Sequence, residues 1–562
     1  MSSAAKSSDV PAASLLNSKQ ISSQPDARFE WLLIFVIFFV IGGAPAPHVN
    51  EAHYLTKAKH YWDPSYCPGD FFLDSADPHL TFYWTVGVLT QWLSLPATAW
   101  VGRVAAWALL ATGWQRLARS VDSSPWIAPL SAALWVVLIE KCNFAGEWIV
   151  GGVEAKCFAY GFVLLGLAAL ARSRWTIVWI WLGLASAMHV LVGAWAVLGA
   201  FAVWITEPRT SRPAFHSLLP GLLLGGVVSL PGLLPALALE RGVDPNVSAE
   251  AARIYVFDRL PHHLAPLTLT TPELLPKLRQ FGLLTVAFVA LWVWASRRSS
   301  HTSADRPPGD HPSAAPTPLD RMLRFAWFSL ATSVVGLIIE VALQGSPLIA
   351  ARVLRYYWFR QADVAVPLAA ALAGTVFMFR MIRSGSRWRA AASTTPALWC
   401  GGVLLATAMG RWLDPVPPAA ARIENLPAWQ DACHWIDANT PPDALFFIPR
   451  SAHSFKWYAS RADVANRKDV PQDAASVVEW RRRCDELFPT VDWFGSVKTL
   501  DSVALQGADK IRELAEAYGA THVIASADQP LDLPVAYTSA VNLDEVQYVV
   551  YETGVAPQDG AP

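Results

Sequence analysis

The chain has 562 residues, of which 53% are hydrophobic and 16% are charged, and its formal net charge is −1. Soluble domains carry roughly 25% charged residues, so this deficit, with a mean hydropathy of +0.30 and 27 tryptophans, indicates an integral membrane protein. The near-neutral charge lacks the basic excess of nucleic-acid-binding proteins, so we expect no nucleic-acid partner.

Long apolar runs recur along the chain between residues 29 and 411. A helix needs about 20 apolar residues to cross a bilayer, and these runs predict a multi-pass α-helical membrane protein with about 11 transmembrane helices. The run 175–206 is divided because the sequence from His189 to Gly193 interrupts it. The apolar segment 80–95 is expected at the membrane interface. The expected spans are 29–46, 98–117, 125–141, 150–171, 175–188, 189–206, 216–238, 279–296, 322–343, 362–380 and 395–411.

Basic residues follow a regular pattern around these spans. Because cytoplasmic loops are enriched in Lys and Arg, the basic turns place the N-terminus in the cytoplasm and the sequence after residue 411 on the other side. We therefore expect an integral membrane protein whose C-terminal domain lies outside the cytoplasm. Composition predicts a disordered cytoplasmic N-terminus over 1–28 and a cytoplasmic linker over 299–319. The basic residues of the expected inner segments are Lys6, Lys19, Arg28, Arg116, Arg119, Arg172, Arg174, Arg209, Arg212, Arg297, Arg298, Arg380, Arg383, Arg387 and Arg389.

After residue 420, short alternating segments replace the long apolar runs. This change predicts a small extracytoplasmic α/β domain over 420–562. It contains no glycine-rich phosphate loop and no nucleophile elbow, so we expect no independent catalytic site there. Whether Cys433 and Cys484 form a disulfide bond is left open by the sequence. The segment 454–473, dense in Lys, Arg and Asp, is either a surface that grips a substrate or a solvated loop.

The outer loop 47–97 follows the first expected span and is rich in carboxylates, histidines, lysines and aromatic side chains. Glu51 and Asp70 are its catalytic candidates. Such a carboxylate could deprotonate an acceptor hydroxyl, or hold a divalent cation that neutralises a phosphate leaving group. The alternative is that they are ordinary solvated acids of a loop.

A second polar cluster surrounds the glycine pair at 151–152. Glu147, Glu154 and Lys156 lie close to expected membrane depth, where charged groups are costly and seldom without a role. We weigh a substrate-binding role equally with an interfacial ion pair. His189, inside the divided apolar run, is expected to pack rather than to catalyse.

Two further clusters are rich in groups that bind phosphate. Arg259 with His262 or His263 suits a phosphate contact, although capping of a loop by the histidines is an equal alternative. The segment 351–367 contains three arginines where the orientation rule expects few, and a planar guanidinium pairs well with phosphate oxygens. Lipid headgroups are the other possible partner of these arginines, which are Arg352, Arg355 and Arg360.

The chain resembles the GT-C superfamily of membrane glycosyltransferases, within it a bacterial multi-pass subgroup. The resemblance rests on the acidic start at 50–54, an interfacial segment over 79–95 and the approach to the second span over 99–103. It implies substrate contacts for His79 and Arg103. Where the family has a paired acidic motif, this chain has Asn50 before Glu51.

By this resemblance, the chain would move a sugar from a polyprenyl-phosphate donor in the membrane to an acceptor outside the cytoplasm, in the cell envelope. The same resemblance implies a place in a bacterial inner membrane. The acceptor, whether glycan, lipid or protein, is left open. No cofactor is expected, and the use of a divalent cation is left open. Two other classes remain open: a lipid or glycan transporter or flippase, and a non-catalytic membrane scaffold that binds cell-envelope glycans. Charges gathered at one surface favour the enzyme over a transporter.

Overall fold

The structure is a computed structural model that describes residues 26–124, 126–304, 315–383, 387–493, 496–541 and 545–556. Most of the expected N-terminal tail, at residues 1–25, lies outside these ranges, as does the centre of the expected linker, at 305–314. A helix continues through the first part of that linker to Ala304, and the next helix begins at Pro318.

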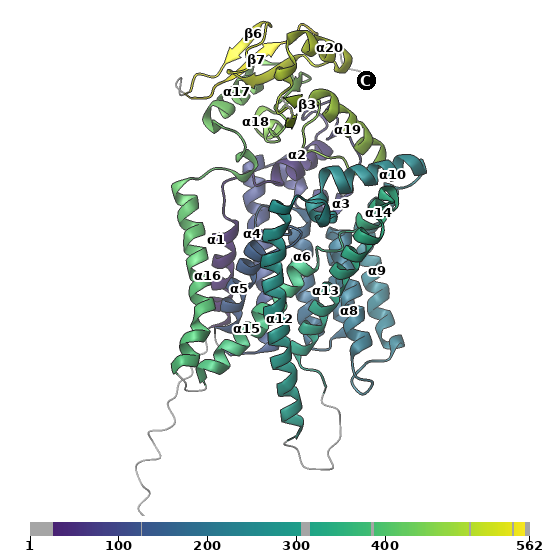
Figure 1. Ribbon diagram of the computed structural model, residues 1–562, viewed down its shortest axis with the longest axis vertical. Coiled ribbons are helices and arrows are strands. Elements are labelled where there is room, and N and C mark those ends of the chain that lie inside the picture. The colour runs from purple at the N-terminus through teal and green to yellow at the C-terminus, as the bar shows by residue number, and fades with distance from the viewer. Residues whose placement is uncertain are drawn as a thin grey trace, which may run out of the picture.

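Long helices standing side by side form the main body of the molecule (Figure 1). Within the described ranges, each of the eleven expected spans coincides with one helix. By length and composition, four are apolar enough to cross a membrane, namely Phe215–Ala238, Thr271–Arg297, Pro318–Ala342 and Ala362–Arg383. The count of about 11 spans thus remains a prediction. The helices are α1 (Ala27–Gly42), α4 (Leu95–Val121), α5 (Ile127–Cys142), α6 (Ala155–Ala171), α7 (Trp175–Met188), α8 (Val190–Thr206), α9 (Phe215–Ala238), α12 (Thr271–Ala304), α13 (Pro318–Ala342), α15 (Ala362–Arg383) and α16 (Arg387–Leu413).

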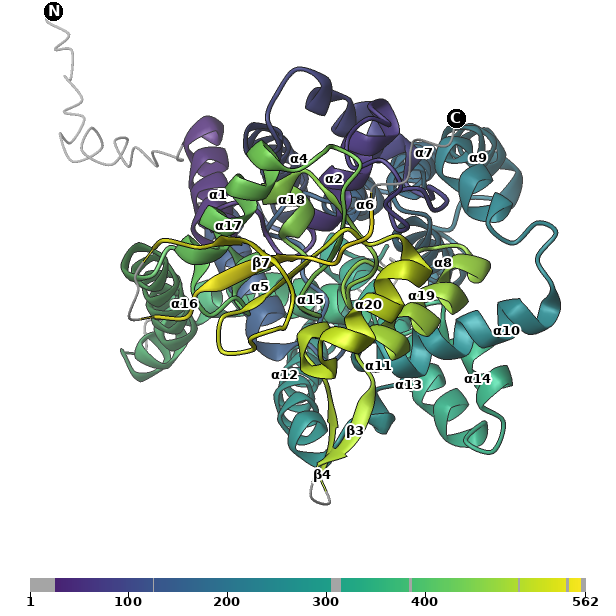
Figure 2. The same ribbon diagram turned by 90° about the horizontal axis from the view of Figure 1, so that it is seen from above.

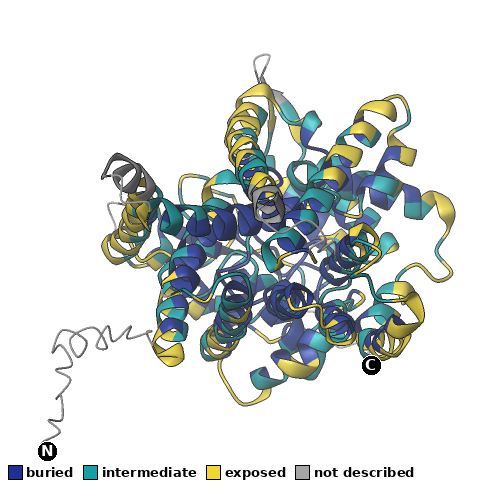
Figure 3. Ribbon diagram, turned by 90° about the horizontal axis from the view of Figure 1, so that it is seen from below, coloured by how far each residue is buried: buried dark blue, intermediate teal, exposed yellow. Residues whose placement is uncertain are grey.

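Burial across the bundle separates a central helix from peripheral ones. In the most apolar stretch of α15, 83% of the residues are buried, against 17% in α9 and α12. Seen from below, buried residues gather at the middle of the bundle and exposed ones at its rim (Figure 3). Exposed apolar side chains such as Leu223 and Leu283 form an outer surface that suits lipid rather than water.

The divided apolar run does break at the expected place. α7 ends at Met188 and α8 begins at Val190, because His189 between them has extended backbone angles, with φ −150° and ψ 104°. The break lets α8 fold back along α7, where the rings of Trp179 and Phe201 lie 4.5 Å apart. It also places His189 at the end of the bundle that contains the polar loops.

The helices α7 and α9 pack closely because Gly225 faces α7. A β-carbon at Gly225 would meet the carbonyl oxygen of Trp179, whereas one at Gly226 would meet nothing within 4 Å. We expect Gly225→Ala to lower the free energy of unfolding by about 1–3 kcal/mol, since extra volume in a packed interface forces backbone shifts. Gly226→Ala is the matched control. It should be neutral or stabilising, because alanine favours a helix more than glycine does.

Unfolding of both variants in detergent micelles would measure this difference. Equal stability of the two variants would contradict a tight contact between α7 and α9.

The short polar helices gather at one end of the bundle, where the C-terminal part of the chain also lies (Figure 1). The expected interfacial segment 80–95 contains two short helices rather than one. The short elements are α2 (Glu51–Trp62), α3 (Leu80–Thr85), η2 (Gly87–Gln91), α10 (Pro245–Arg253), the π-helical η3 (Ile254–Arg259), α11 (Pro261–Leu264), η4 (Pro266–Thr268) and α14 (Pro347–Leu354).

The C-terminal part lies over the middle of the bundle (Figure 2). A five-stranded sheet has the order β2-β1-β5-β7-β6, in which β1 runs parallel to β2 and β5, and a separate hairpin pairs β3 with β4. The elements are η5 (Pro418–Ala420), α17 (Leu426–Asn439), β1 (Leu445–Phe447), α18 (Phe455–Ala459), β2 (Ala462–Asp463), α19 (Ala474–Leu487), β3 (Thr490–Trp493), β4 (Ser496–Thr499), η6 (Val503–Gln506), α20 (Ala508–Tyr518), β5 (His522–Ser526), β6 (Val535–Thr538) and β7 (Tyr548–Glu552).

Cysteine pairing, left open by the sequence, is decided by the packing of this part. Cys433 is a buried thiol in the cluster beneath α17, whereas Cys484 on α19 contacts two other hydrophobic clusters. All six cysteines of the chain are unpaired.

Candidate functional site

A polar cavity of about 340 Å³ lies between the bundle and the C-terminal part. Its walls come from α2, the loop before α6, η3 and α11, the segment between α14 and α15, and the loop 466–472 that follows β2. Four of its lining side chains are cationic and two are carboxylates. They are Lys156, Arg259, Arg360 and Lys468, with Glu147 and Glu154.

A chain of ion pairs crosses the floor of this cavity. Lys156 Nζ lies 3.0 Å from both Glu147 Oε1 and Glu154 Oε1, and Arg360 Nε donates to Glu147 Oε2 at 2.8 Å. Burial opposes ionisation of Glu147, but the charges of Arg360 and Lys156 outweigh it and hold its pKa below the ordinary value. The predicted cluster around the glycine pair is therefore a connected network that faces a cavity.

Asp363, at the start of α15, holds the loop that presents Glu147. Its carboxylate accepts hydrogen bonds from the backbone N–H groups of Phe144, Ala145 and Glu147, at 2.7, 2.8 and 3.2 Å. These donors belong to the main chain of a loop more than 200 residues away in sequence.

The three predicted arginines of segment 351–367 separate in the structure. Arg360 enters the polar cavity and lies over the ring of Tyr357, 3.8 Å from its centroid. Arg355 pairs with Glu240 at the mouth of a second cavity. Arg352 donates to the carbonyl of Pro245 at 2.9 Å and lines neither cavity, so the expected phosphate contact of Arg352 is not retained.

The cluster of Arg259, His262 and His263 does reach the polar cavity. The His262 and His263 rings lie 4.1 Å apart, and His263 Nδ1 pairs with the carbonyl oxygen of Ala145. His263 thus braces the loop before α6. Among the described residues, the buried Nε of Arg259 has no hydrogen-bond partner.

The second cavity, of about 380 Å³, is mainly apolar and joins the first. Its walls include Leu233, Ala236 and Leu237 of α9, with Ala251 and Ala252 of α10. The two cavities share six lining residues, which are Tyr54, His189, Tyr255, Tyr357, Arg360 and Gln472. An apolar groove therefore adjoins a cationic chamber, and Arg360 lies at their junction.

His79 and His189 lie beside this junction. The ring centroids are 5.6 Å apart, Tyr54 Oη lies 3.2 Å from His79 Nε2, and Arg360 Nη1 donates to His189 Nε2 at 3.3 Å. Burial lowers the pKa of His79 to about 3, so its imidazole is neutral at pH 7. The expected substrate contact of His79 is geometrically available, and His189 packs against the same junction.

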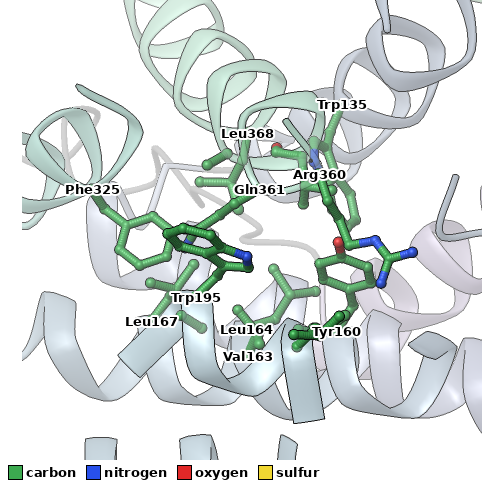
Figure 4. A pocket seen from close by; sticks show the side chains of 15 residues that line it. Trp135, Tyr160, Val163, Leu164, Leu167, Trp195, Phe325, Arg360, Gln361 and Leu368 are labelled. Atoms are coloured by element: carbon green, nitrogen blue, oxygen red, sulfur yellow. Dashed lines mark hydrogen bonds between the residues drawn. The ribbon is translucent and has the colours of Figure 1, made fainter. Parts of the chain in front are cut away.

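Below Arg360 the chamber ends in tightly packed apolar side chains. A void of about 20 Å³ remains there, lined mainly by residues such as Trp195, Leu164 and Phe325 (Figure 4). It has room for about one water molecule, which needs about 10–15 Å³ on this measure, and is too small for a ligand. Any substrate therefore stays on the chamber side of Arg360.

Glu51 is placed differently from the expected catalytic base. Its side chain is fully buried and does not line the cavity. Oε1 accepts from Arg103 Nε at 2.6 Å and from the Val153 N–H at 2.8 Å. Oε2 accepts from Arg103 Nη2 at 2.5 Å and from the His48 N–H at 2.6 Å. Because both oxygens of Glu51 are occupied, the base role expected for Glu51 and the substrate contact expected for Arg103 are not retained.

Asp70 also lies away from the cavity. It is fully buried, and its carboxylate accepts from the backbone N–H groups of Leu73 at 2.9 Å and Asp463 at 3.0 Å. Lys456 of α18 lies 3.2 Å from it and also pairs with Asp463 and Asp469. Asp70 thus fastens the C-terminal part to the outer loop, and the catalytic role expected for it is not retained.

The sequence analysis missed two linked polar residues of the cavity, Lys468 in the loop 466–472 and Asn50 before α2. Lys468 Nζ donates to Asn50 Oδ1 at 2.6 Å, and Asn50 Nδ2 donates to Glu154 Oε2 at 2.9 Å. The segment 454–473 had been noticed for its charge density, but nothing local distinguished Lys468 within it. Asn50, noted only as a departure from a family pattern, proves to be the link between Lys468 and Glu154.

The carboxylates of this site pair with cations of the chain itself. Among the described parts of the chain, no group of three or more His, Cys, Asp or Glu side chains could hold a metal ion. The two cavity carboxylates already pair with Lys156 or Arg360. The cations of the chain itself are the groups available to a phosphate.

Fold and site together define a helical membrane protein whose apolar groove opens into a cationic chamber. A family model described as a domain of unknown function (DUF6798) matches residues 427–487, a segment that includes Lys468 and Gln472. No curated protein matches the chain.

Several solved structures are similar to the chain at low identity. The oligosaccharyltransferase of Archaeoglobus fulgidus, tethered to an acceptor peptide with the NVT sequon, has a TM-score of 0.43 and 13% identity over 89% of this chain and 69% of that chain. The same enzyme, AglB, with an inhibitory peptide and a dolichol-phosphate, has a TM-score of 0.41 and 13% identity over 95% and 75%. ArnT from Cupriavidus metallidurans, bound to undecaprenyl phosphate, has a TM-score of 0.36 and 13% identity over 95% and 99%.

These neighbours are GT-C membrane glycosyltransferases, the superfamily that the sequence resembles. With TM-scores below 0.5, the likeness carries no argument about the activity of this chain.

Proposed function

We propose that this protein is a membrane glycosyltransferase that takes a sugar from a polyprenyl-phosphate donor. The observation that carries the proposal is that the two cavities adjoin and that Arg360 lines both of them. A ligand that fills both must have a long apolar part and an anionic head. A polyprenyl phosphate has this combination, because its isoprenoid chain suits the leucine-lined groove and its phosphate suits a guanidinium.

Arg360 is the residue assigned to the donor phosphate. It lies at the junction of the two cavities, and its guanidinium is held by Glu147 and His189. Side chains locked by such hydrogen bonds need little reorganisation when charge develops on a leaving group. The chamber is also partly closed to water by the C-terminal part, which strengthens charge interactions within it.

Glu154 is the residue assigned to the acceptor. Its Oε2 is held by Asn50, and its Oε1 has no hydrogen-bond partner in the described structure other than the ion pair with Lys156. In the proposed reaction Glu154 takes the proton of an acceptor hydroxyl as the acceptor oxygen bonds to the sugar's anomeric carbon. The bond from that carbon to the phosphate oxygen breaks, and its electron pair leaves with the lipid phosphate.

The orientation inferred from the basic turns would place this chamber on the extracytoplasmic side of a bacterial inner membrane. All the chamber-forming loops lie at the end of the bundle that contains the C-terminal part (Figure 1). The acceptor would then be a component of the cell envelope, with no class of acceptor favoured by the lining residues.

Binding of undecaprenyl phosphate tests the proposal. We expect it to raise the unfolding temperature of the purified protein in detergent micelles, whereas undecaprenol, which lacks the phosphate, should not. Arg360→Gln should weaken the binding at least about tenfold, as expected for loss of a hydrogen bond to a charged group. Arg352→Gln is the matched control, since Arg352 lines neither cavity. Equal stabilisation by undecaprenol would show that the chamber does not bind the phosphate group, and it would refute the proposal.

A further inference from the structure

Two cations of the chamber are not accounted for by the donor phosphate. Arg259 and Lys468 line the polar cavity but not the apolar groove, so they lie beyond the junction at Arg360. Lys156 and Arg360 are balanced by Glu147 and Glu154. In the described residues, neither Arg259 nor Lys468 forms an ion pair with a carboxylate at 4.0 Å or less.

Both cations and carboxylates surround these two side chains, since Glu154 and Asp469 act on Lys468 as well as Arg259 and Lys156. Burial lowers the pKa of Lys468 to about 8, and the charge of Arg259 is the next largest cause. Arg450 and Arg422 act on the neighbouring Arg467 in the same sense. Like charges brought together in a partly buried place repel each other, and an anion between them would relieve the repulsion.

We propose that Arg259 and Lys468 form a second anion subsite, which binds a phosphate group other than the one at Arg360. The subsite is shared between η3 of the membrane part and the loop 466–472 of the C-terminal part. The C-terminal part is therefore a component of the substrate site. This inference rests on the proposed function for the position of the first phosphate.

The phosphate can come from two sources. It is either the second phosphate of a polyprenyl-diphosphate donor or a phosphate group on the soluble side, carried by the acceptor. Either source would place a phosphate oxyanion between the Arg259 guanidinium and the Lys468 ammonium. Undecaprenyl diphosphate and inorganic phosphate are the probes that separate them.

Affinities of full-length protein in detergent micelles test the subsite. For a lipid source, we expect undecaprenyl diphosphate to bind about tenfold more tightly than undecaprenyl phosphate, as one charged hydrogen-bonded contact implies. Arg259→Gln and Lys468→Gln should each remove that advantage and leave undecaprenyl phosphate binding within about twofold of wild type. For a soluble source, inorganic phosphate should instead stabilise the protein, and the same variants should abolish the effect.

Arg467→Gln is the matched control for bulk charge. It removes one positive charge from the same loop, but its side chain does not line the cavity. Lys468→Gln retains a donor for Asn50, so a loss caused by misplacing Asn50 is separated from a loss of charge. Unliganded unfolding temperatures of all variants should match that of wild type.

The pH dependence gives an independent readout. A bound phosphate favours protonated Lys468, whereas free Lys468 loses its proton as the pH passes about 8. Affinity for the second phosphate should therefore fall between pH 7.5 and 9 in wild type. Lys468→Arg should keep its affinity for the second phosphate over this pH range, because a guanidinium stays protonated throughout it. The groups that face Lys468 and share in this titration are Arg259, Glu154, Asp469 and Lys156.

The outcomes separate this subsite from the donor site. If undecaprenyl phosphate binds wild type, but the diphosphate gains nothing and inorganic phosphate has no effect, the subsite is refuted while the proposed function stands. If undecaprenyl phosphate does not bind, the proposed donor site is refuted. Stabilisation by inorganic phosphate is then the test of the second subsite. An equal loss of phosphate binding in Arg467→Gln would also refute the subsite, because the loss would then follow from the net positive charge of the loop rather than from contact with the phosphate.

Discussion

Arg103→Met is expected to lower the free energy of unfolding by about 3–5 kcal/mol, which is the usual cost of removing one partner of a buried ion pair. Both side chains of the Arg103–Glu51 pair are fully buried. The variant would leave the Glu51 carboxylate with only the two backbone donors of His48 and Val153. It would also leave the carbonyl of Ala44 without the Arg103 Nη1 donor at 2.5 Å.

Two further variants give this prediction its controls. Arg103→Met combined with Glu51→Gln should recover a large part of the loss, because no buried charge then lacks a partner. Arg481→Met breaks an exposed pair with Asp485 on α19 and a longer one, at 3.8 Å, with Asp258 of η3. It should cost less than about 1 kcal/mol, because the Arg481 side chain is exposed. Urea unfolding in detergent micelles would compare all of them. A loss in Arg103→Met no greater than in Arg481→Met would show that the Glu51 pair does not stabilise the start of α2.

Glu154→Gln is expected to lower turnover by about 10²–10⁴-fold, the usual contribution of a positioned general base. Binding of undecaprenyl phosphate should stay near the wild-type value, because Glu154 contacts the acceptor side of the chamber in the proposed reaction. Turnover would be measured as release of undecaprenyl phosphate from the lipid-linked sugar that stabilises the wild-type protein most.

Glu140→Gln is a suitable control for the loss of one carboxylate, since Glu140 is half exposed at the end of α5 and pairs only loosely with Lys141, at 4.0 Å. It should leave turnover unchanged. Full activity in Glu154→Gln would transfer the base role to another cavity residue. A parallel loss of undecaprenyl phosphate binding would instead indicate that Glu154 orders the donor site.

Much of the candidate site could be predicted from local sequence. Glu147, Glu154 and Lys156 stand out because charged residues beside a long apolar run are costly unless they serve a purpose. Arg259 and Arg360 stand out for the same reason on the expected outer side. The structure brings these residues to one cavity. Their meeting follows from topology, because all of them lie in loops at the same end of the helices.

The choice of catalytic carboxylate could not be predicted in this way. Glu51 and Asp70 look like free loop acids in the sequence, but a carboxylate is free only if no distant cation reaches it. Arg103 lies 52 positions from Glu51, and Lys456 approaches Asp70 from the C-terminal part. Nothing in the neighbourhood of either acid in the sequence indicates these partners.

Hydropathy and charge alone determined the helical architecture, because the length of an apolar run decides whether a helix suits a bilayer and the basic turns bias its orientation. His189, between two apolar runs, was enough to divide α7 from α8. Tertiary structure alone decided which charged groups are paired and which face the chamber. Lys468 and Asn50 are separated by 418 positions, and only the docking of the C-terminal part onto the bundle brings them together beside Glu154.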